Sequence, residues 1–261
     1  MPRAFLFEFE DQRWFPQIIR QGMMDYLRHM IGWLEFYKPA AEIIKNALEK
    51  SQNSDVVELS AGGGGGVTKM IEYLQKIGRS PRVILTDLYP NISTWQDLKN
   101  ASSQIDYIGE SVNALQVPEH ITGLRVMFSA LHHFKPNQVK QIFLDTMSKK
   151  ASLAFFDAGT TSPLNILTVL LFEPITFVLL TPLFKPFRWS RLFFTYIIPL
   201  IIVCTLWDGS ISVLRFYRKR ELRSILRALP DNNYIWKVGT FKNKWGIPVN
   251  YVTGYPFNQN H

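Results

Sequence analysis

The stretch Asp55-Val-Val-Glu-Leu-Ser-Ala-Gly-Gly-Gly-Gly-Gly66-Val-Thr-Lys-Met70 decides the fold of this chain. A short apolar run leads into five consecutive glycines, and apolar residues then recur at helical spacing as far as Gly78. A second apolar run follows at residues 82–87. A strand, a glycine loop, a helix and a second strand within about 30 residues form a βαβ unit. The stretch therefore predicts a parallel sheet.

The rest of the chain continues this alternation on both sides of the unit. We expect helices where apolar residues recur every three or four positions, within residues 14–50, 136–148 and 218–229. We expect strands at the short apolar runs, at residues 105–108, 124–131, 152–156, 234–241 and 249–255. The predicted class is α/β, with helices on both faces of a mostly parallel sheet.

Composition bounds the domain organisation. The chain has 261 residues, of which 47% are hydrophobic and 19% charged, so it can bury a core, and disorder is excluded. We expect an N-terminal helical segment at residues 1–50, an α/β domain at 51–162 and 207–261, and a hydrophobic insert at 163–206. The single cysteine, Cys204, cannot form an internal disulfide, which favours a reducing compartment or a membrane context.

The glycine run predicts a ligand loop, because glycines between a strand and a helix let the backbone approach an anionic or polar ligand. A phosphate-binding Walker loop is excluded, since the run ends Gly66-Val67-Thr68-Lys69 rather than Gly-Lys-Ser/Thr. The dinucleotide fingerprint needs glycines over six positions, and this run has five. A plain tight turn remains the alternative, although five glycines exceed what a turn needs.

The pattern Glu58-x-Ser60-x-Gly62-x-Gly64 resembles motif I of the class I S-adenosylmethionine-dependent methyltransferases. The resemblance implies S-adenosylmethionine as cofactor and a Rossmann-like sheet of seven strands, mostly parallel, with helices on both faces. It also implies that Gly62, Gly63 and Gly64 approach the methionine portion of the cofactor. Ser60 stands where the motif commonly has its first glycine.

Two later segments match the cofactor motifs of this family. Asp87, followed by Leu88, stands at the end of the second strand, where the resemblance implies a carboxylate that accepts the ribose hydroxyls. A turn or helix-capping aspartate is the alternative. Asn113 and Ala114 occupy the place of the residues near the adenine amino group, and a surface asparagine is the alternative reading.

The segment Phe128-Ser129-Ala-Leu-His132-His133-Phe134 is similar to the end of the fourth strand in this family. The resemblance places Ser129 in the cofactor site and both histidines beside the reactive methyl group. Either imidazole could accept a proton near neutral pH, so His132 and His133 are the candidate catalytic residues. Alternatively, one of them caps the next helix or packs beside Phe134.

Residues 7–16 and 207–217 are similar to stretches in a bacterial subgroup of these methyltransferases whose substrate is undefined. The similarity implies no chemistry for either segment. We predict no metal site.

The insert predicts contact with a membrane. Its 44 residues include only Glu173, Lys185, Arg188 and Arg191 as charged residues. Because sheet elements flank it, both of its ends must lie on one side of a membrane, and a spanning hairpin would export three basic residues against the positive-inside rule. We therefore expect a hairpin lying in one leaflet, with these basic residues and Trp189 at the level of the headgroups. A soluble apolar cap or a dimer interface is the alternative.

The charge distribution agrees with an anionic membrane surface as a partner. The net charge is +8, and residues 215–227 alone carry six basic residues against Glu221. A solvated helix face is the alternative. Nucleic acid is not an expected partner, because the basic residues cluster beside the insert and no base-methylation motif such as N-P-P-Y is present.

Together these features favour an enzyme that transfers a methyl group from S-adenosylmethionine to a small, hydrophobic or lipid-like acceptor. The enzyme is expected to be membrane-associated, with its catalytic domain on the cytoplasmic side, and a homodimer through the insert is possible. The alternative is a non-catalytic membrane-peripheral scaffold of the same fold, which the departures at Ser60 and Asn113 would favour.

Overall fold

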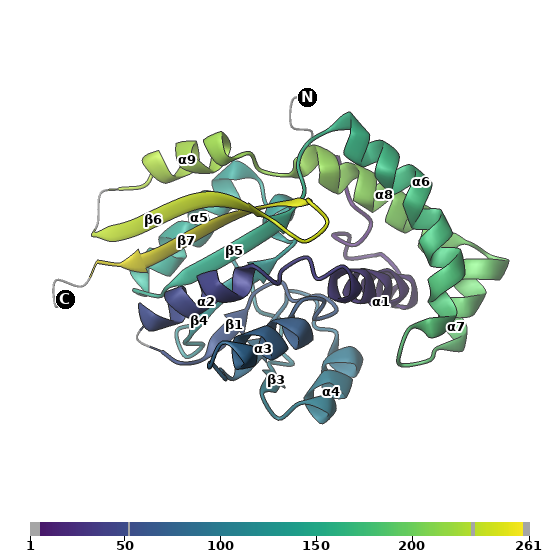
Figure 1. The fold of residues 1–261 in the computed structure, drawn as a ribbon, viewed down its shortest axis with the longest axis horizontal. Coiled ribbons are helices and arrows are strands. Elements are labelled where there is room, and N and C mark those ends of the chain that lie inside the picture. The colour runs from purple at the N-terminus through teal and green to yellow at the C-terminus, as the bar shows by residue number, and fades with distance from the viewer. Residues whose placement is uncertain (1–5, 52, 231–232, 258–261) are drawn as a thin grey trace.

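The computed structural model describes residues 6–51, 53–230 and 233–257. Seven strands form one sheet with the order β3-β2-β1-β4-β5-β7-β6 (Figure 1). The strands are β1 (Val56–Glu58), β2 (Val83–Leu85), β3 (Ile105–Tyr107), β4 (Leu124–Phe128), β5 (Leu153–Ala158), β6 (Tyr234–Lys242) and β7 (Pro248–Pro256). Strands β1 to β5 are parallel, and β7 is antiparallel to both of its neighbours. The predicted mostly parallel seven-stranded sheet is confirmed.

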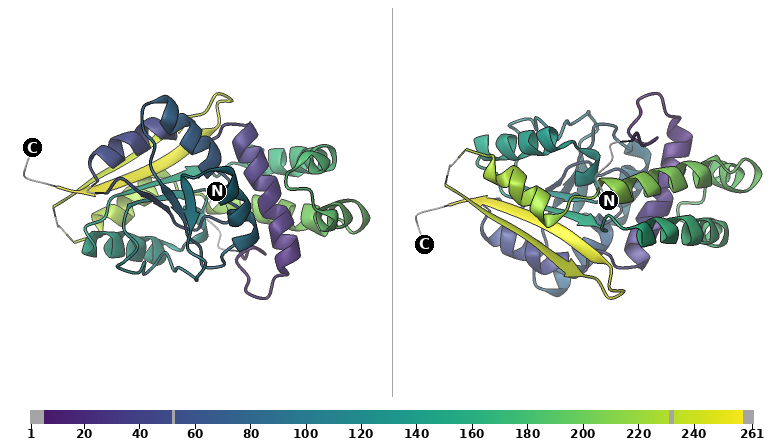
Figure 2. Two further views of the ribbon diagram at one scale, coloured as in Figure 1. Left: turned by 90° about the horizontal axis from the view of Figure 1, so that it is seen from below. Right: turned by 90° about the horizontal axis from the view of Figure 1, so that it is seen from above.

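The helices are α1 (Gln17–Trp33), α2 (Ala40–Glu49), α3 (Val67–Lys76), α4 (Ile92–Ala101), α5 (Pro136–Ser148), α6 (Pro163–Leu180), α7 (Trp189–Leu192), α8 (Leu200–Arg215) and α9 (Lys219–Arg227). The shorter turns are η1 (Leu131–His133), η2 (Thr181–Leu183) and η3 (Phe193–Ile197). Helices α2 and α3 cover one face of the sheet, and α5 and α9 cover the other (Figure 2). Helix α4 is not among the helices that the sequence predicts.

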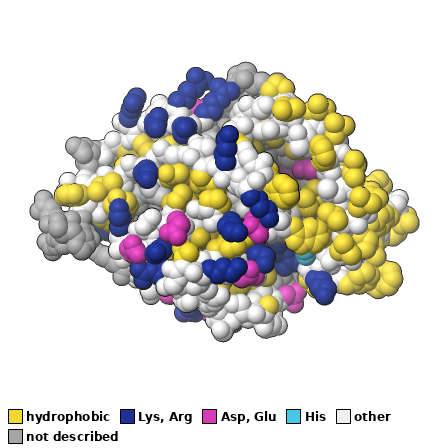
Figure 3. Space-filling model, in the orientation of Figure 1, with side chains coloured by type: hydrophobic (Ala, Val, Ile, Leu, Met, Phe, Trp, Pro, Cys, Tyr) yellow, Lys and Arg dark blue, Asp and Glu magenta, His cyan; other side chains and the backbone are white. Residues whose placement is uncertain are grey.

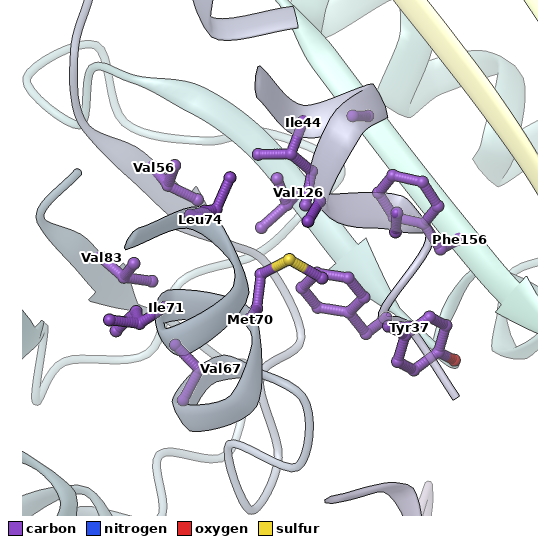
Figure 4. Packing of buried hydrophobic residues seen from close by; sticks show 14 of the residues in the cluster. Tyr37, Ile44, Val56, Val67, Met70, Ile71, Leu74, Val83, Val126 and Phe156 are labelled. Carbon is purple, nitrogen blue, oxygen red and sulfur yellow. The ribbon is translucent and has the colours of Figure 1, made fainter. Parts of the chain in front are cut away.

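The core on the first face is built around α3. Met70 and Leu74 of α3 pack with Ile44 of α2 against the apolar side chains of the strands, among them Val126 and Phe156 (Figure 4). All five side chains are buried. The helical spacing behind the glycine run therefore supplies the face that fastens the glycine loop to the sheet.

The core on the second face uses the helix predicted at residues 136–148. Val139, Ile142 and Phe143 of α5 are completely buried against β4 and β5. Arg125 of β4 is 2% exposed and lies 2.7 Å from Asp145 of α5, which compensates its buried charge.

The apolar insert folds into helices that stand beside α1 (Figure 1). Ile19, Met23 and Tyr26 of α1 pack with Phe177 of α6 and Ile201 of α8 in a third apolar cluster. The rings of Tyr26 and Phe177 stack with centroids 3.7 Å apart. Helix α8 runs without a break through residue 206, where the sequence analysis ended the insert.

The outer face of the insert is apolar and exposed. The helix spanning Pro163–Leu183 is long and apolar enough to cross a membrane, with a mean hydropathy of 2.1 over its most apolar 18 residues, of which 11% are buried. A core helix of a soluble protein can pass the same test of length and composition, but such a helix is mostly buried. Figure 3 shows hydrophobic side chains gathered over the end of the molecule that α6, α7 and α8 form. We call the exposed side chains of α6 the apolar surface: Leu164, Leu167, Leu170, Leu171, Phe172, Ile175, Val178 and Leu179.

The expected exposure of the basic residues in the insert is wrong in part. Arg191 is 2% exposed, and its Nη1 atom lies 2.5 Å from Oδ2 of Asp25 on α1. Arg188 also faces Asp25, at 3.6 Å, and Asp97, at 3.8 Å. Buried Asp25 attracts these guanidinium groups inward, so Arg191 is buried and Arg188 is partly buried, whereas Lys185 and Trp189 are exposed.

The basic residues at positions 215–227 also include both buried and exposed side chains. Arg215 is buried against the carboxylates of Glu8 and Asp11. Lys219, Arg220, Arg223 and Arg227 on α9 are exposed. The surface charge predicted here is therefore carried by α9, where Figure 3 shows Lys and Arg side chains together.

Candidate active site

A cavity of about 390 Å³ opens at the carboxyl ends of β1, β2 and β4 and is closed on another side by α1. Parallel strands bring these three ends to one edge of the sheet, where open α/β sheets hold their ligands. The volume is in the range of pockets for small molecules and cofactors. Eight of the predicted site residues line it: Glu58, Ser60, Gly62, Gly63, Asp87, Leu88, Ser129 and His133.

The glycine loop turns sharply after β1. Ser60, Gly62 and Gly64 all have positive φ, at 55°, 51° and 66°. The amide of Gly64 donates to the carbonyl of Ala61 at 2.7 Å and closes the turn. Ser60 thus adopts the backbone conformation that a glycine in its place would adopt without strain. Ser60 therefore occupies a position that favours glycine.

Asp87 joins the second strand to the glycine loop. Its Oδ2 accepts a hydrogen bond from the amide of Gly62 at 2.8 Å, and its Oδ1 accepts one from the amide of Tyr89 at 2.8 Å. Burial raises the pKa of Asp87, although these two bonds act in the opposite direction. A partly buried carboxylate therefore faces the cavity with its orientation held by two backbone amides.

Glu58 lies behind the loop at the end of β1 and is 2% exposed. Burial, with a smaller contribution from the charge of Asp87, raises the pKa of Glu58 to about 8. Glu58 is therefore mainly protonated at neutral pH, whereas motif I implies only that the residue at this position is acidic.

His133 reaches the cavity and is surrounded by carboxylates. Its Nδ1 lies 2.8 Å from Oε2 of Glu8 and 2.9 Å from Oδ1 of Asp11, and its Nε2 lies 3.3 Å from Oε1 of Glu10. Burial by itself lowers the pKa of His133, but the charges of Glu8 and Asp11 outweigh it and raise the pKa well above its ordinary value. Burial raises the pKa of Glu10 to about 8.

His132 has a different environment. It is buried, and its Nδ1 lies 2.7 Å from Oδ1 of Asp157, at the end of β5. The ring centroids of His132 and His133 lie 4.4 Å apart, but only His133 lines the cavity.

Three other predicted residues also lie outside the cavity wall. Asn113 is exposed, and its side-chain oxygen accepts from the amide of Leu115 at 3.0 Å. Ala114 is buried in the second core cluster. Gly64 does not line the cavity, and a Cβ placed on it would contact Leu98.

Two parts of the cavity wall lie outside the residues that the sequence predicts. One is the N-terminal segment, through Glu10 and Asp11, and the other is α1, through residues such as Arg20 and Arg28. The signal in the sequence for the N-terminal segment is the similarity of residues 7–16 and 207–217 to one subgroup of methyltransferases. The structure packs these two segments together: Asp208 accepts from the amides of Phe9, at 2.7 Å, and Glu10, at 3.0 Å.

No protein-family model matches the sequence, and no curated protein matches it. Solved structures do match. The O-methyltransferase NcsB1 from neocarzinostatin biosynthesis, in complex with S-adenosyl-L-homocysteine and 1,4-dihydroxy-2-naphthoic acid, matches with a TM-score of 0.50 and 10% identity over 89% of this chain and 56% of its own. A SAM-dependent methyltransferase from Aquifex aeolicus matches with a TM-score of 0.48 and 11% identity over 88% of this chain and 97% of its own. The mitomycin 7-O-methyltransferase MmcR matches with a TM-score of 0.48 and 13% identity over 84% of this chain and 54% of its own.

The chain spans about half the length of NcsB1 and of MmcR. At this level of identity the similarity to NcsB1 identifies the fold. It is the class I methyltransferase-like α/β fold that the sequence predicts.

Proposed function

We propose that this chain binds S-adenosylmethionine and transfers its methyl group to an acceptor held in the same cavity. The observation that carries the proposal is the arrangement at the sheet edge. A glycine loop after β1 and a partly buried carboxylate after β2 face one cavity, and Asp87 and Gly62 are joined by a hydrogen bond of 2.8 Å. Neither tight-turn geometry nor helix capping requires that both groups line a cavity.

Each part of the wall has a role in this proposal. The loop at Gly62 and Gly63 lets the backbone approach the methionine portion of the cofactor, because no side chain intervenes. Asp87 accepts the ribose hydroxyls. Leu88, which lines the cavity and is 45% exposed, supplies an apolar surface for the adenine. Asn113 and Ala114 have no assigned contact in this arrangement.

The reaction is an in-line displacement in which the acceptor attacks the methyl carbon and the sulfonium leaves as a thioether. Holding the two reactants in line supplies much of the rate of such a reaction. Of the two candidate histidines only His133 lines the cavity, and because the charges of Glu8 and Asp11 raise its pKa well above the ordinary value, it faces the acceptor as a protonated imidazolium and not as a proton acceptor. Glu8 and Asp11 orient its ring.

We propose a small, hydrophobic or lipid-like acceptor, taken from an anionic membrane surface on the cytoplasmic side. Two observations support this. The apolar surface of α6 is exposed, and the basic side chains of α9 follow directly on the end of α8. Helix α1 connects the cavity to the insert. Met24, Leu27 and Ile31 line the cavity, and Met23 and Tyr26 pack against the insert.

Cofactor binding is tested by isothermal titration of the purified chain with S-adenosylmethionine and S-adenosylhomocysteine. The expected result is one site per chain with micromolar affinity, weakened at least tenfold in Asp87→Ala. Asp97→Ala is the matched control, since Asp97 is half exposed and does not line the cavity. Absence of binding to the wild-type chain would contradict the enzyme and favour a non-catalytic scaffold.

Membrane association is tested by flotation with vesicles of neutral lipid alone or with one-third anionic lipid. Removing the whole insert is unsuitable, because Phe177 and Ile201 belong to a buried cluster. Leu171→Ser/Ile175→Ser/Leu179→Ser changes only exposed side chains of α6 and should abolish flotation. Trp245→Ser, which removes an exposed aromatic on the β6–β7 turn, is the control. A wild-type chain that remains soluble as a dimer would instead identify the apolar surface as a dimer interface.

A further inference from the structure

A cluster of imidazole and carboxylate groups lies beside the cavity and is not used by the cofactor site. Glu8, His132 and His133 each offer a ligand atom, and these atoms all lie within 4.8 Å of one another. Glu8 is completely buried, and His132 is 3% exposed. Glu8 comes from the N-terminal segment, whereas the histidines form the turn η1 after β4.

The groups around this cluster orient the possible ligands. Asp157 lies 2.7 Å from Nδ1 of His132, so it fixes the ring and leaves Nε2 as the available nitrogen. Ser212 donates to Oε1 of Glu8 at 3.1 Å and leaves Oε2 facing His133. Carboxylates that hold a histidine ring in this way are typical of metal sites, where they set the tautomer and the basicity of the ligand.

The charge of the cluster favours a cation. Five carboxyl groups meet here, those of Glu8, Glu10, Asp11, Asp157 and Asp208. Burial raises the pKa of Glu10 to about 8 and that of Asp208 to about 7, so these two groups carry only part of their negative charge at neutral pH. The guanidinium of Arg215, which lies 2.9 Å from Glu8 and 3.0 Å from Asp11, and the protonated imidazole of His133 offset part of the remaining charge. A divalent cation would replace the proton of His133 and would leave Arg215 in contact with Asp11.

We propose that Glu8, His132 and His133 bind one divalent transition-metal ion, with Zn²⁺ as the ion that fits best. Two imidazoles and one carboxylate are a donor set of Zn²⁺ and Fe²⁺ sites, whereas Mg²⁺ and Ca²⁺ prefer oxygen ligands alone. The ion would cross-link the N-terminal segment to the end of β4, next to the cavity. This inference does not rest on the proposed methyl transfer. An ion bound there would take the place of the proton that Glu8 and Asp11 hold on His133.

The test uses the full, untagged chain after treatment with a chelator and gel filtration. Zn²⁺ is titrated in competition with a chromophoric chelator, and bound metal is counted by mass spectrometry. One Zn²⁺ per chain is expected, with a rise in the melting temperature. Affinity should fall at least tenfold in His132→Ala and in Glu8→Gln. His120→Ala, which removes an exposed histidine outside the cluster, should bind as the wild type does, and Mg²⁺ should not compete.

Asp157→Asn keeps all three ligands and covers the case in which the ligand variants do not fold. It should weaken Zn²⁺ binding by about 10- to 100-fold, because it removes the group that orients His132. Binding below one equivalent, or equal affinity in the wild type, His132→Ala and Asp157→Asn, would overturn the proposal. The same preparations are titrated with S-adenosylmethionine. Loss of that binding with intact Zn²⁺ binding would count against the methyltransferase alone, and the reverse result would count against the metal site alone.

Discussion

The conformation of the glycine loop leads to a prediction about two neighbouring glycines. Gly64 has a φ of +66°, and a Cβ placed on it would lie 2.6 Å from Cδ1 of Leu98. Gly66 has a φ of −99°, and the nearest atoms to a Cβ there are those of Phe128 at 3.4 Å, which is ordinary contact. The two positions are therefore a matched pair in one loop. Only the first requires glycine.

Gly64→Ala should lower the free energy of unfolding by about 2–4 kcal/mol. The left-handed conformation costs a residue with a Cβ about 1–2 kcal/mol. Crowding of the buried side chain of Leu98 adds about 1–2 kcal/mol, toward the lower end for an overpacked core, since the atom displaced is the end of a side chain. Gly66→Ala should stay within about 1 kcal/mol of the wild type. The gain from a less flexible unfolded chain is about 0.4–1 kcal/mol, and a poorer helix N-terminus offsets it.

The assay is urea unfolding followed by circular dichroism, in one detergent for all variants and without added cofactor. The midpoint should shift for Gly64→Ala with an unchanged dependence on urea, which would indicate a change of stability alone. Equal midpoints for the two variants, or a larger loss for Gly66→Ala, would refute the steric reasoning and the course of the loop described here.

Three further predictions concern buried charges. Asp25→Asn should destabilise the chain by about 3–5 kcal/mol, because it leaves Arg191 buried without its carboxylate, and Arg191→Met should cost less; thermal unfolding of both variants compares them. The pKa of Glu58 is raised to about 8 in the folded chain from an ordinary 4.5, so the folded chain binds this proton more tightly than the unfolded chain does. The protonated Glu58 contributes fully to the free energy of unfolding below pH 4.5, and this contribution is lost as the pH rises towards 8. Glu58→Gln should therefore flatten the fall in unfolding free energy over this interval by a few kcal/mol, and a pH series of urea unfolding that showed equal slopes would contradict the assignment. Asp87→Asn keeps one of the two acceptor oxygens, so the affinity for S-adenosylmethionine should fall about tenfold in a calorimetric titration. An unchanged circular dichroism spectrum of the variant would show that the fold is intact.

Helix α4, which the sequence does not predict, has a weak pattern of apolar residues. Helix α4, Ile92–Ala101, buries Trp95 and Leu98 but is otherwise polar or exposed along most of its length. Its apolar residues are too few to indicate a period on their own. Contact with the glycine loop, through the indole of Trp95 and the carbonyl of Gly62, is what gives this helix its place.

The basic residues show a second limit of prediction from the sequence. Arg191 and Arg215 were assigned to a lipid-facing surface because their neighbours along the chain are apolar or basic. Each is buried against an acid far away in the sequence, Asp25 for the first and Glu8 for the second. Exposure of a long charged side chain depends on such partners, and linear spacing does not reveal them.

The sequence by itself determined the α/β class and the place of the glycine loop after the first strand, and the resemblance to the methyltransferase motifs singled out Asp87 after the second. The class depends on local periodicity, and the meeting of the two segments depends on one general property of parallel strands, whose carboxyl ends lie at one edge of the sheet. The tertiary structure alone decided which histidine faces the cavity. It also brought Glu8, Glu10 and Asp11 to His133, over more than 120 positions of sequence. The physical reason is that a carboxylate can approach an imidazole from any point of the chain, and only the packing of the N-terminal segment against α8 selects these three.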